Sequence, residues 1–198
     1  GGSSDDEPYI NTENGFINNL NAGFHYSNKW DDKKTLMISP KFNRQLYDNL
    51  QNNFTQRQVG DSVLNDYSSL NQNVSRYNFK NNLSYEIKFD SSNSLKLTGK
   101  ANFYHTESNE ESHGRSISNT QTLKNSTDRF LNQKIDKESF SGSAIFRHKF
   151  KKLRRTLSVN ADWNLLNTES NNLLKSKNQT YDAGLPAFAQ EQNQVNDV

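Results

Sequence analysis

The sequence predicts an all-β protein made of antiparallel up-and-down hairpins. Three observations carry this prediction: short turns recur at equal spacing, alternating apolar and polar residues flank each turn, and the intervening segments are long and polar. The expected turns are Asn28–Lys34, Asp90–Ser94 and Lys151–Arg155, and their centres lie 61 residues apart. About ten alternating residues flank each turn, close to the length of a membrane-spanning β-strand. The chain is therefore expected to be a section of a transmembrane β-barrel with long extracellular loops.

The first expected hairpin covers about residues 16–46. Phe16, Leu20 and Phe24 lie on one face of its first strand, because side chains on a strand alternate with period two. Pro40 falls on the apolar face of the returning strand. Since proline lacks a backbone donor, we expect a bulge or a local break in the ladder there.

The second hairpin, about residues 77–105, has the clearest alternation. Its first strand has one apolar face, interrupted by Asn81, and an opposite face without apolar residues. The apolar face comprises Tyr77, Phe79, Leu83, Tyr85, Ile87 and Phe89. The third hairpin, about residues 140–166, repeats the pattern with Phe140, Ala144, Phe146 and Phe150 and then Leu157, Val159, Ala161, Trp163 and Leu165. A helix would need apolar residues at three- and four-residue spacing, which these segments lack.

The connections at the other end are expected to be long loops, at about residues 47–76 and 106–138. Both are rich in Asn, Gln, Ser, Asp and Glu, although parts such as Gln51–Gln58 and Ser116–Thr122 could continue as strands. Short turns at one end and long polar connections at the other are typical of bacterial outer-membrane barrels, whose short turns face the periplasm. The asymmetry therefore predicts a sidedness.

Composition favours a barrel wall over an ordinary soluble domain. Only 31% of the 198 residues are hydrophobic, against about 45–50% in typical domains. A net charge of +2 and 11% aromatic residues are not the usual signature of disorder, and this charge gives no reason to expect nucleic acid as a partner. No cysteine, no signal peptide and no apolar run of about 18 residues is present.

Residues 1–198 are interpreted as one partial barrel domain. Six strands are fewer than the eight of the smallest bacterial barrels, and the last residues show no closing strand with a terminal aromatic. Two explanations remain open: the chain is a section of a larger barrel, or several copies contribute strands to a shared wall. We favour the section.

Two stretches carry a family resemblance. They are Gly15-Phe16 with Leu20–Trp30, and Gly60–Val63 with Tyr77–Leu95. Both resemble the outer-membrane β-barrel family of TonB-dependent receptor-like proteins, over about residues 15–165. The resemblance implies an outer-membrane location, a large barrel of about 22 strands and energised uptake of a nutrient. The plug domain and the energy-coupling box of such proteins are not evident in this sequence.

No catalytic, cofactor-binding or metal-binding residue is predicted, and no cofactor is expected. The four histidines, His25, His105, His113 and His148, are widely spaced, and no nucleophile motif stands out. His105 and His148 fall on the apolar side of their strands, so each should lie near a membrane boundary unless the alternation slips. The acidic groups Asp5-Asp6-Glu7 and Glu107 with Glu110-Glu111 are interpreted as solvated charge.

The charged and aromatic residues near the turns are interpreted as residues at a membrane surface. The basic run from Lys149 to Arg155 is interpreted as a solvated turn, with contact to anionic lipid as the alternative. Aromatic rings are expected to form two girdles. The girdle at the turns would contain Phe24, Tyr26, Trp30, Phe89 and Phe150, and the opposite one Phe103, Tyr104 and Trp163.

The predicted function is therefore the wall and extracellular loops of an outer-membrane TonB-dependent receptor-like transporter for nutrients. It is not predicted to be an enzyme. The expected location is the bacterial outer membrane, and the expected partners are its lipid, the rest of the barrel with its plug domain, and an unknown extracellular ligand. The alternative is a β-sandwich binding or adhesion module, soluble or on the cell surface, in which the apolar faces pack against each other.

Overall fold

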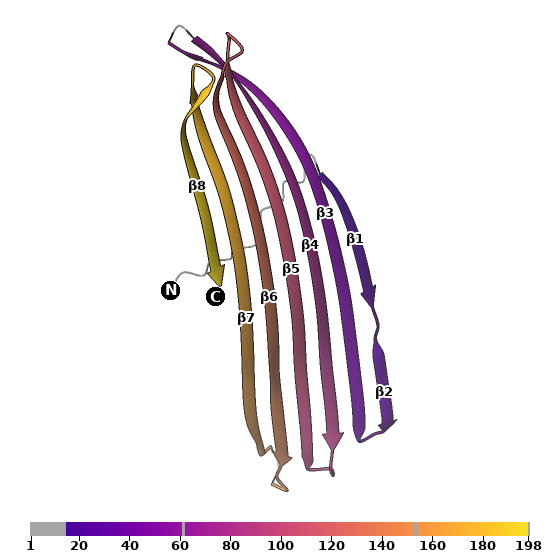
Figure 1. Cartoon of the computed structure of the whole chain (residues 1–198). Coiled ribbons are helices and arrows are strands. Elements are labelled where there is room, and N and C mark those ends of the chain that lie inside the picture. The colour runs from indigo at the N-terminus through magenta and orange to yellow at the C-terminus, as the bar shows by residue number, and fades with distance from the viewer. Residues whose placement is uncertain (1–14, 61, 153, 198) are drawn as a thin grey trace.

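The structure, a computed structural model, describes residues 15–60, 62–152 and 154–197, which form one open antiparallel sheet without helices. The predicted all-β, up-and-down arrangement is confirmed. The strands are β1 (Gly15–Gly23), β2 (Tyr26–Asp31), β3 (Lys34–Val59), β4 (Ser62–Lys88), β5 (Asn93–Ser118), β6 (Leu123–Lys149), β7 (Thr156–Asp182) and β8 (Leu185–Asp197). They lie side by side in chain order, with β1 and β2 both paired to β3 (Figure 1).

The turns lie at two opposite ends of the sheet. At the lower end of Figure 1, here called the turn end, β2 connects to β3, β4 to β5 and β6 to β7. The first turn falls within the segment predicted from the sequence, and the other two begin one residue before theirs. At the opposite end, here called the far end, β3 connects to β4, β5 to β6 and β7 to β8. Gly60 and Gly184 adopt positive φ angles in two of these far-end turns, a conformation that suits glycine.

The prediction of long loops at 47–76 and 106–138 is wrong in its secondary structure, although the allowed continuation of Gln51–Gln58 as a strand is confirmed. In both segments the strands continue, and the hydrogen-bonded register runs unbroken from Tyr47 opposite Val74 to Val59 opposite Ser62. The backbone supplies these hydrogen bonds whatever the side chains are. Because polar residues occupy both faces here, no alternation marks these strands in the sequence.

Pro40 causes the predicted break, but in the neighbouring strand. β3 passes through Pro40 and pairs with β4 without interruption. On the other side, β1 ends at Gly23 and β2 begins at Tyr26, and the Phe24 N–H donates to the Pro40 carbonyl at 3.0 Å. A strand residue directs its N–H and its C=O to the same side, so the donor that Pro40 lacks faces this gap.

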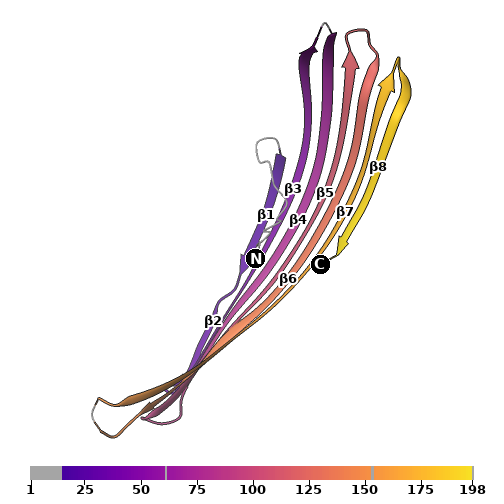
Figure 2. The same ribbon diagram turned by 90° about the vertical axis from the view of Figure 1, so that its left-hand side faces the viewer.

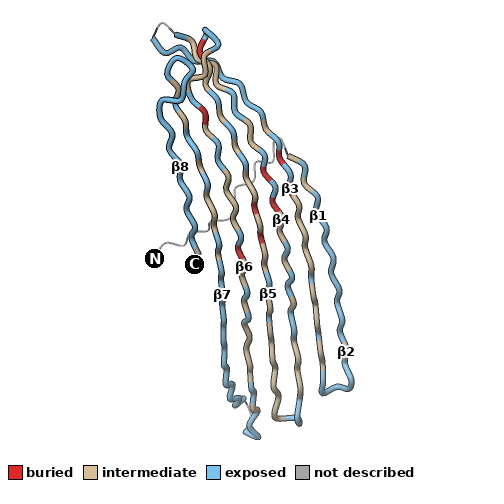
Figure 3. Tube along the Cα trace, in the orientation of Figure 1, coloured by how far each residue is buried: buried red, intermediate tan, exposed pale blue. Residues whose placement is uncertain are grey.

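The sheet bends along its length and twists, as Figure 2 shows from the side. In its described part it is a single layer, and only three apolar side chains are buried: Tyr47, Val74 and Ile135. Figure 3 shows the buried positions at mid-height and above, with none near the turn end. A β-sandwich within this chain is therefore excluded for the described residues. None of these residues belongs to a helix able to span a membrane.

Candidate functional surface

One face of the sheet carries a continuous apolar belt next to the turn end. Residues paired directly opposite each other share a face, and Phe42, Phe79 and Phe103 lie opposite one another on three strands. This side is called the apolar face, and the other the polar face. The belt comprises Leu20, Ala22, Tyr26, Leu36, Ile38, Phe42, Phe79, Leu83, Tyr85, Ile87, Leu95, Leu97, Ala101, Phe103, Phe140, Ala144, Phe146, Leu157, Val159, Ala161, Trp163 and Leu165.

No other layer of the described protein covers this belt. Even on central strands its side chains are well exposed, at 38% for Phe79, 41% for Leu83 and 39% for Phe140. The belt extends over about ten residues along the strands and five strand spacings, an area of roughly 800 Å². The largest apolar patch of a typical soluble monomer is about 300–600 Å². An uncovered belt of this size is typical of a surface that contacts a membrane or another protein.

Aromatic rings line the far edge of the belt. The Phe79 and Phe103 ring centroids are 6.3 Å apart, and Phe140 meets Phe103 edge-on at 5.3 Å. The predicted girdle at this level is wrong for two of its three members. Tyr104 lies on the polar face, where Lys137 approaches its ring, and Trp163 lies inside the belt, directly opposite Gly142.

At the turn end, a polar network borders the belt. The Asp90 carboxylate accepts hydrogen bonds from the Ser92 and Asn93 backbone N–H groups and the Asn93 side chain, at 2.6, 2.8 and 2.7 Å. The hydrogen bonds from the Asn93 side chain and then from the Ser92 N–H lower the pKa of Asp90. His148 lies 2.7 Å from Asn93 and packs edge-on against Phe150. His148 is thus at the edge of the belt, on the side of its strand that the alternation predicts.

The basic run from Lys149 to Arg155 lies beside this network. Lys151, Lys152 and Arg155 line an open hollow together with Asp90 and His148. All three of these cationic side chains are exposed to solvent. The run therefore borders the belt at the turn end.

At the far border of the belt, charged residues replace apolar ones within one row. Leu20, Arg44, Tyr77, His105 and Asp136 lie opposite one another on successive strands. The His105 Nδ1 and the Asp136 carboxylate are 2.5 Å apart, and the same carboxylate lies 3.7 Å from the Lys134 ammonium. His105 is therefore also at an edge of the belt, and the alternation does not slip.

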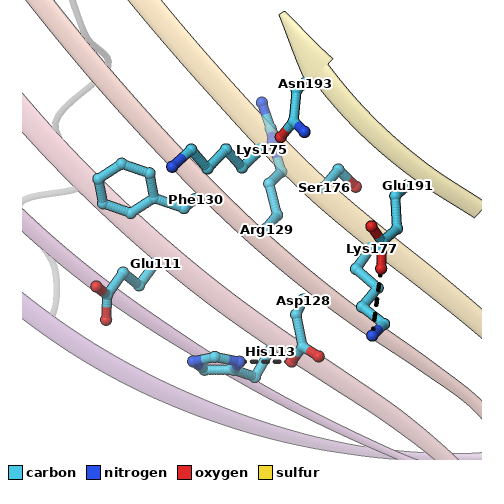
Figure 4. Close-up of a pocket in the computed structure, with 10 residues that line it drawn as sticks. All are labelled: Glu111, His113, Asp128, Arg129, Phe130, Lys175, Ser176, Lys177, Glu191 and Asn193. Carbon is cyan, nitrogen blue, oxygen red and sulfur yellow. Dashed lines mark hydrogen bonds and ion pairs between the residues drawn. The ribbon is translucent and has the colours of Figure 1, made fainter.

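Beyond this row the same face is mostly polar and charged up to the far end, although Leu50 and Phe54 on β3 are exposed apolar residues there. Figure 4 shows an open hollow across β5 to β8, where His113 pairs with Asp128 at 2.7 Å and Lys177 with Glu191 at 3.3 Å. The exposed charges of these pairs are matched across neighbouring strands. One face of the sheet thus changes from apolar near the turn end to charged near the far end.

The belt crosses the strands obliquely. On β7 the edge of the belt toward the turn end is Leu157. On β2 this edge is Tyr26, which lies in the same hydrogen-bonded row as Trp163 on β7. Trp163 is six residues beyond Leu157, so this edge shifts by six residues between β7 and β2. The edge toward the far end is Leu165 on β7 and Leu20 on β1. Relative to the hydrogen-bonded rows, this edge shifts by four residues in the same direction. Both shifts occur over five strand spacings of about 4.8 Å, and each residue rises by about 3.3 Å along a strand. The belt is therefore tilted by about 30–40° relative to the hydrogen-bonded rows.

Behind the belt, the polar face is rich in positive charge. Seven cations and two acids lie on β3 to β7 over the height of the belt. The cations are Lys41, Lys80, Lys88, Lys96, Lys100, Lys137 and Arg147, and the acids are Glu86 and Asp162. This net charge of +5 exceeds the +2 of the whole chain. Alternation alone assigned some of these lysines to the polar face, but their grouping depends on the register.

The acidic groups considered from the sequence do not converge. Glu107 and Glu111 lie on the apolar-face side of β5, whereas Glu110 lies on the polar face. Among the described residues, no group of three or more His, Asp or Glu side chains is placed to hold a metal ion. Asp5, Asp6 and Glu7 lie outside the described residues.

Comparison with known proteins adds no assignment. No protein-family model matches the chain, and no curated protein is significantly similar to it. The function must therefore be argued from the surface itself.

Proposed function

We propose that this chain forms part of the wall of a bacterial outer-membrane β-barrel. In this proposal the apolar belt contacts lipid, the polar face lines a water-filled lumen, and the turn end faces the periplasm. The far halves of β3 to β8 then extend beyond the membrane on the outside. The partners are outer-membrane lipid, the remaining strands of the barrel and a plug domain.

The shape of the belt carries the proposal. The strands of outer-membrane barrels tilt by about 35–45° and present an apolar band about 25 Å tall. A lipid bilayer is flat, so its band must cross tilted strands obliquely, as the belt does. On β4 the belt runs from Phe79 to Ile87, with Tyr77 next to its far end. At a tilt of about 30–40° this segment spans about 20–30 Å along the membrane normal.

We further propose that the barrel belongs to a TonB-dependent receptor-like transporter that takes up nutrients. The resemblance of residues 15–165 to that family supports this part. So do the long outer strands, which provide a large external surface for capturing a ligand. An open sheet of eight strands is an arc of such a wall and not a closed pore.

The test compares lysine substitutions on the two faces of one strand. Leu83 lies near mid-belt on the apolar face, so Leu83→Lys should destabilise the lipid-inserted protein by about 2–4 kcal/mol. Ser84 faces the opposite side, with Met37 and Thr98 as its neighbours, so Ser84→Lys should have little effect. Ser84 is a better control than Asn82, because Asn82 lies directly opposite Lys100.

The measurement is refolding of the full chain into phospholipid vesicles, followed by urea unfolding and far-ultraviolet circular dichroism. The wild-type chain should gain its strand signal only with lipid or detergent. A soluble, two-state folded monomer without either would contradict the membrane proposal. Equal effects of the two lysines would contradict the assigned facing.

A further inference from the structure

Two lysines on the polar face lie directly opposite each other. Lys41 on β3 pairs with Lys80 on β4, and both side chains are exposed. Lys100 on β5 lies diagonally beside them, two residues from the position opposite Lys80. Like charges directly opposite in a sheet are destabilising. Within the described part of the chain none of the three lysines forms an ion pair, so no acid offsets this repulsion.

A hollow lies at this lysine pair. Asn21, Gly23, Asn43 and Asn78 line it together with Lys41 and Lys80. The Asn43 side chain donates a hydrogen bond to Asn21, which joins the two amides on β1 and β3. Gly23 adds no side chain, and the nearest atom to its missing Cβ is the Lys41 Cγ at 3.7 Å. The hollow therefore combines two ammonium groups with amide donors and stays open.

We propose that this hollow binds an anionic group, a phosphate or a carboxylate, of a water-soluble solute. Ammonium and amide N–H groups are the donors that such oxygens accept from. The surplus of five positive charges over the surrounding polar face would attract the same class of solute. The inference rests on the proposed function and deepens it, because it assigns an anionic class to the solute that passes along this wall.

The experiment uses the full chain refolded in a nonionic detergent and labelled with ¹⁵N-glycine. The chain has nine glycines, of which Gly23 lies in the hollow while Gly99 and Gly142 lie on the apolar face. Inorganic pyrophosphate at low salt is the probe, and sucrose is the neutral control. We expect the Gly23 amide resonance to shift saturably with pyrophosphate only, while those of Gly99 and Gly142 stay in place.

Two variants test the lysines. Lys41→Gln/Lys80→Gln should weaken pyrophosphate binding about tenfold or more for each lysine removed. It should still fold, because it relieves a repulsion, and an unchanged glycine spectrum without ligand checks this. Lys96→Gln is the matched control, since Lys96 lies opposite Glu86 on the same face, and its affinity should equal that of the wild type.

Three results would overturn the inference: no saturable shift at Gly23, equal shifts at all glycines, or unchanged affinity in the double variant. If the chain proves to fold without detergent, the same titration is performed in buffer. The anion site and the membrane proposal can therefore fail separately.

Discussion

Gly142 is the position in the belt where the absence of a side chain matters most. It lies opposite Gly99 on one side and Trp163 on the other, and the Trp163 ring occupies the space that a Cβ would need. The Thr98 carbonyl oxygen would lie only 2.8 Å from that Cβ. The indole thus covers the gap that the two glycines leave in the belt.

Gly142→Ala should therefore destabilise the folded chain by about 1–3 kcal/mol, because the Trp163 ring and the Thr98 backbone must both move. Gly99→Ala is the matched control. Its Cβ would meet only Leu83 at ordinary contact distance, so we expect a gain of about 0.4–1 kcal/mol. Urea unfolding in vesicles, followed by tryptophan fluorescence, measures both. Similar losses for the two alanines would contradict the special role of Gly142.

The contact between Gly142 and Trp163 shows why the sequence could not predict every residue. Alternation correctly placed Trp163 on the apolar face of its strand. Its depth, however, depends on which residue lies opposite, and that register is set only when β6 and β7 pair. The same holds for Lys41 and Lys80, whose alternation was readable but whose direct opposition was not.

Among the elements, the turn between β4 and β5 is fixed by one carboxylate. The Asp90 carboxylate accepts hydrogen bonds from the Ser92 and Asn93 backbone N–H groups and from the Asn93 side chain. In a tight turn without this carboxylate, these donors would hydrogen-bond to water instead. These bonds favour the ionised form, mainly through the Asn93 side chain and then the Ser92 N–H, and they lower the pKa of Asp90 below its usual 3.8.

Asp90→Ala should therefore destabilise this hairpin in a pH-dependent way. A lowered folded-state pKa gives stability that is present above pH 3.8 and is lost as the pH falls through the folded value. The difference between wild type and variant in the urea midpoint should thus be largest near neutral pH and shrink below about pH 4. Ser91→Ala in the same turn is the control, and a difference that persists unchanged at low pH would contradict this role for Asp90.

Some strand segments could be predicted from the sequence, and others could not. The turn-end halves of the strands were predictable because one face is apolar and the other polar, as from Phe79 to Ile87. The far halves were less evident, because both faces of β3 carry polar residues there: Asn49, Gln51 and Asn53 on one face, and Asp48 and Asn52 beside Leu50 and Phe54 on the other. Their pairing rests on the backbone, which side-chain patterns do not report.

At the scale of the whole molecule, the two faces differ in chemistry at the same height. The apolar belt is backed by a polar face with a net charge of +5, so a single layer carries an apolar surface on one side and a charged surface on the other. An exposed belt contributes little to stability in water, because burial of apolar surface is the main favourable term in folding. The oblique course of the belt then fixes the tilt of the strands in the surrounding medium.

This tilt predicts that residues in one hydrogen-bonded row lie at different membrane depths. Leu36 and Ala161 share a row, four strand spacings apart, but Leu36 is at the turn-side edge of the belt and Ala161 near its middle. A tilt of about 30–40° places Ala161 about 10–12 Å deeper along the membrane normal. Nitroxide labels on Leu36→Cys and Ala161→Cys in vesicles measure this depth through their relative accessibility to oxygen and to a nickel chelate. Ala161 should be the more accessible to oxygen, whereas equal depths would mean that the strands run along the normal and that the belt is not a membrane band.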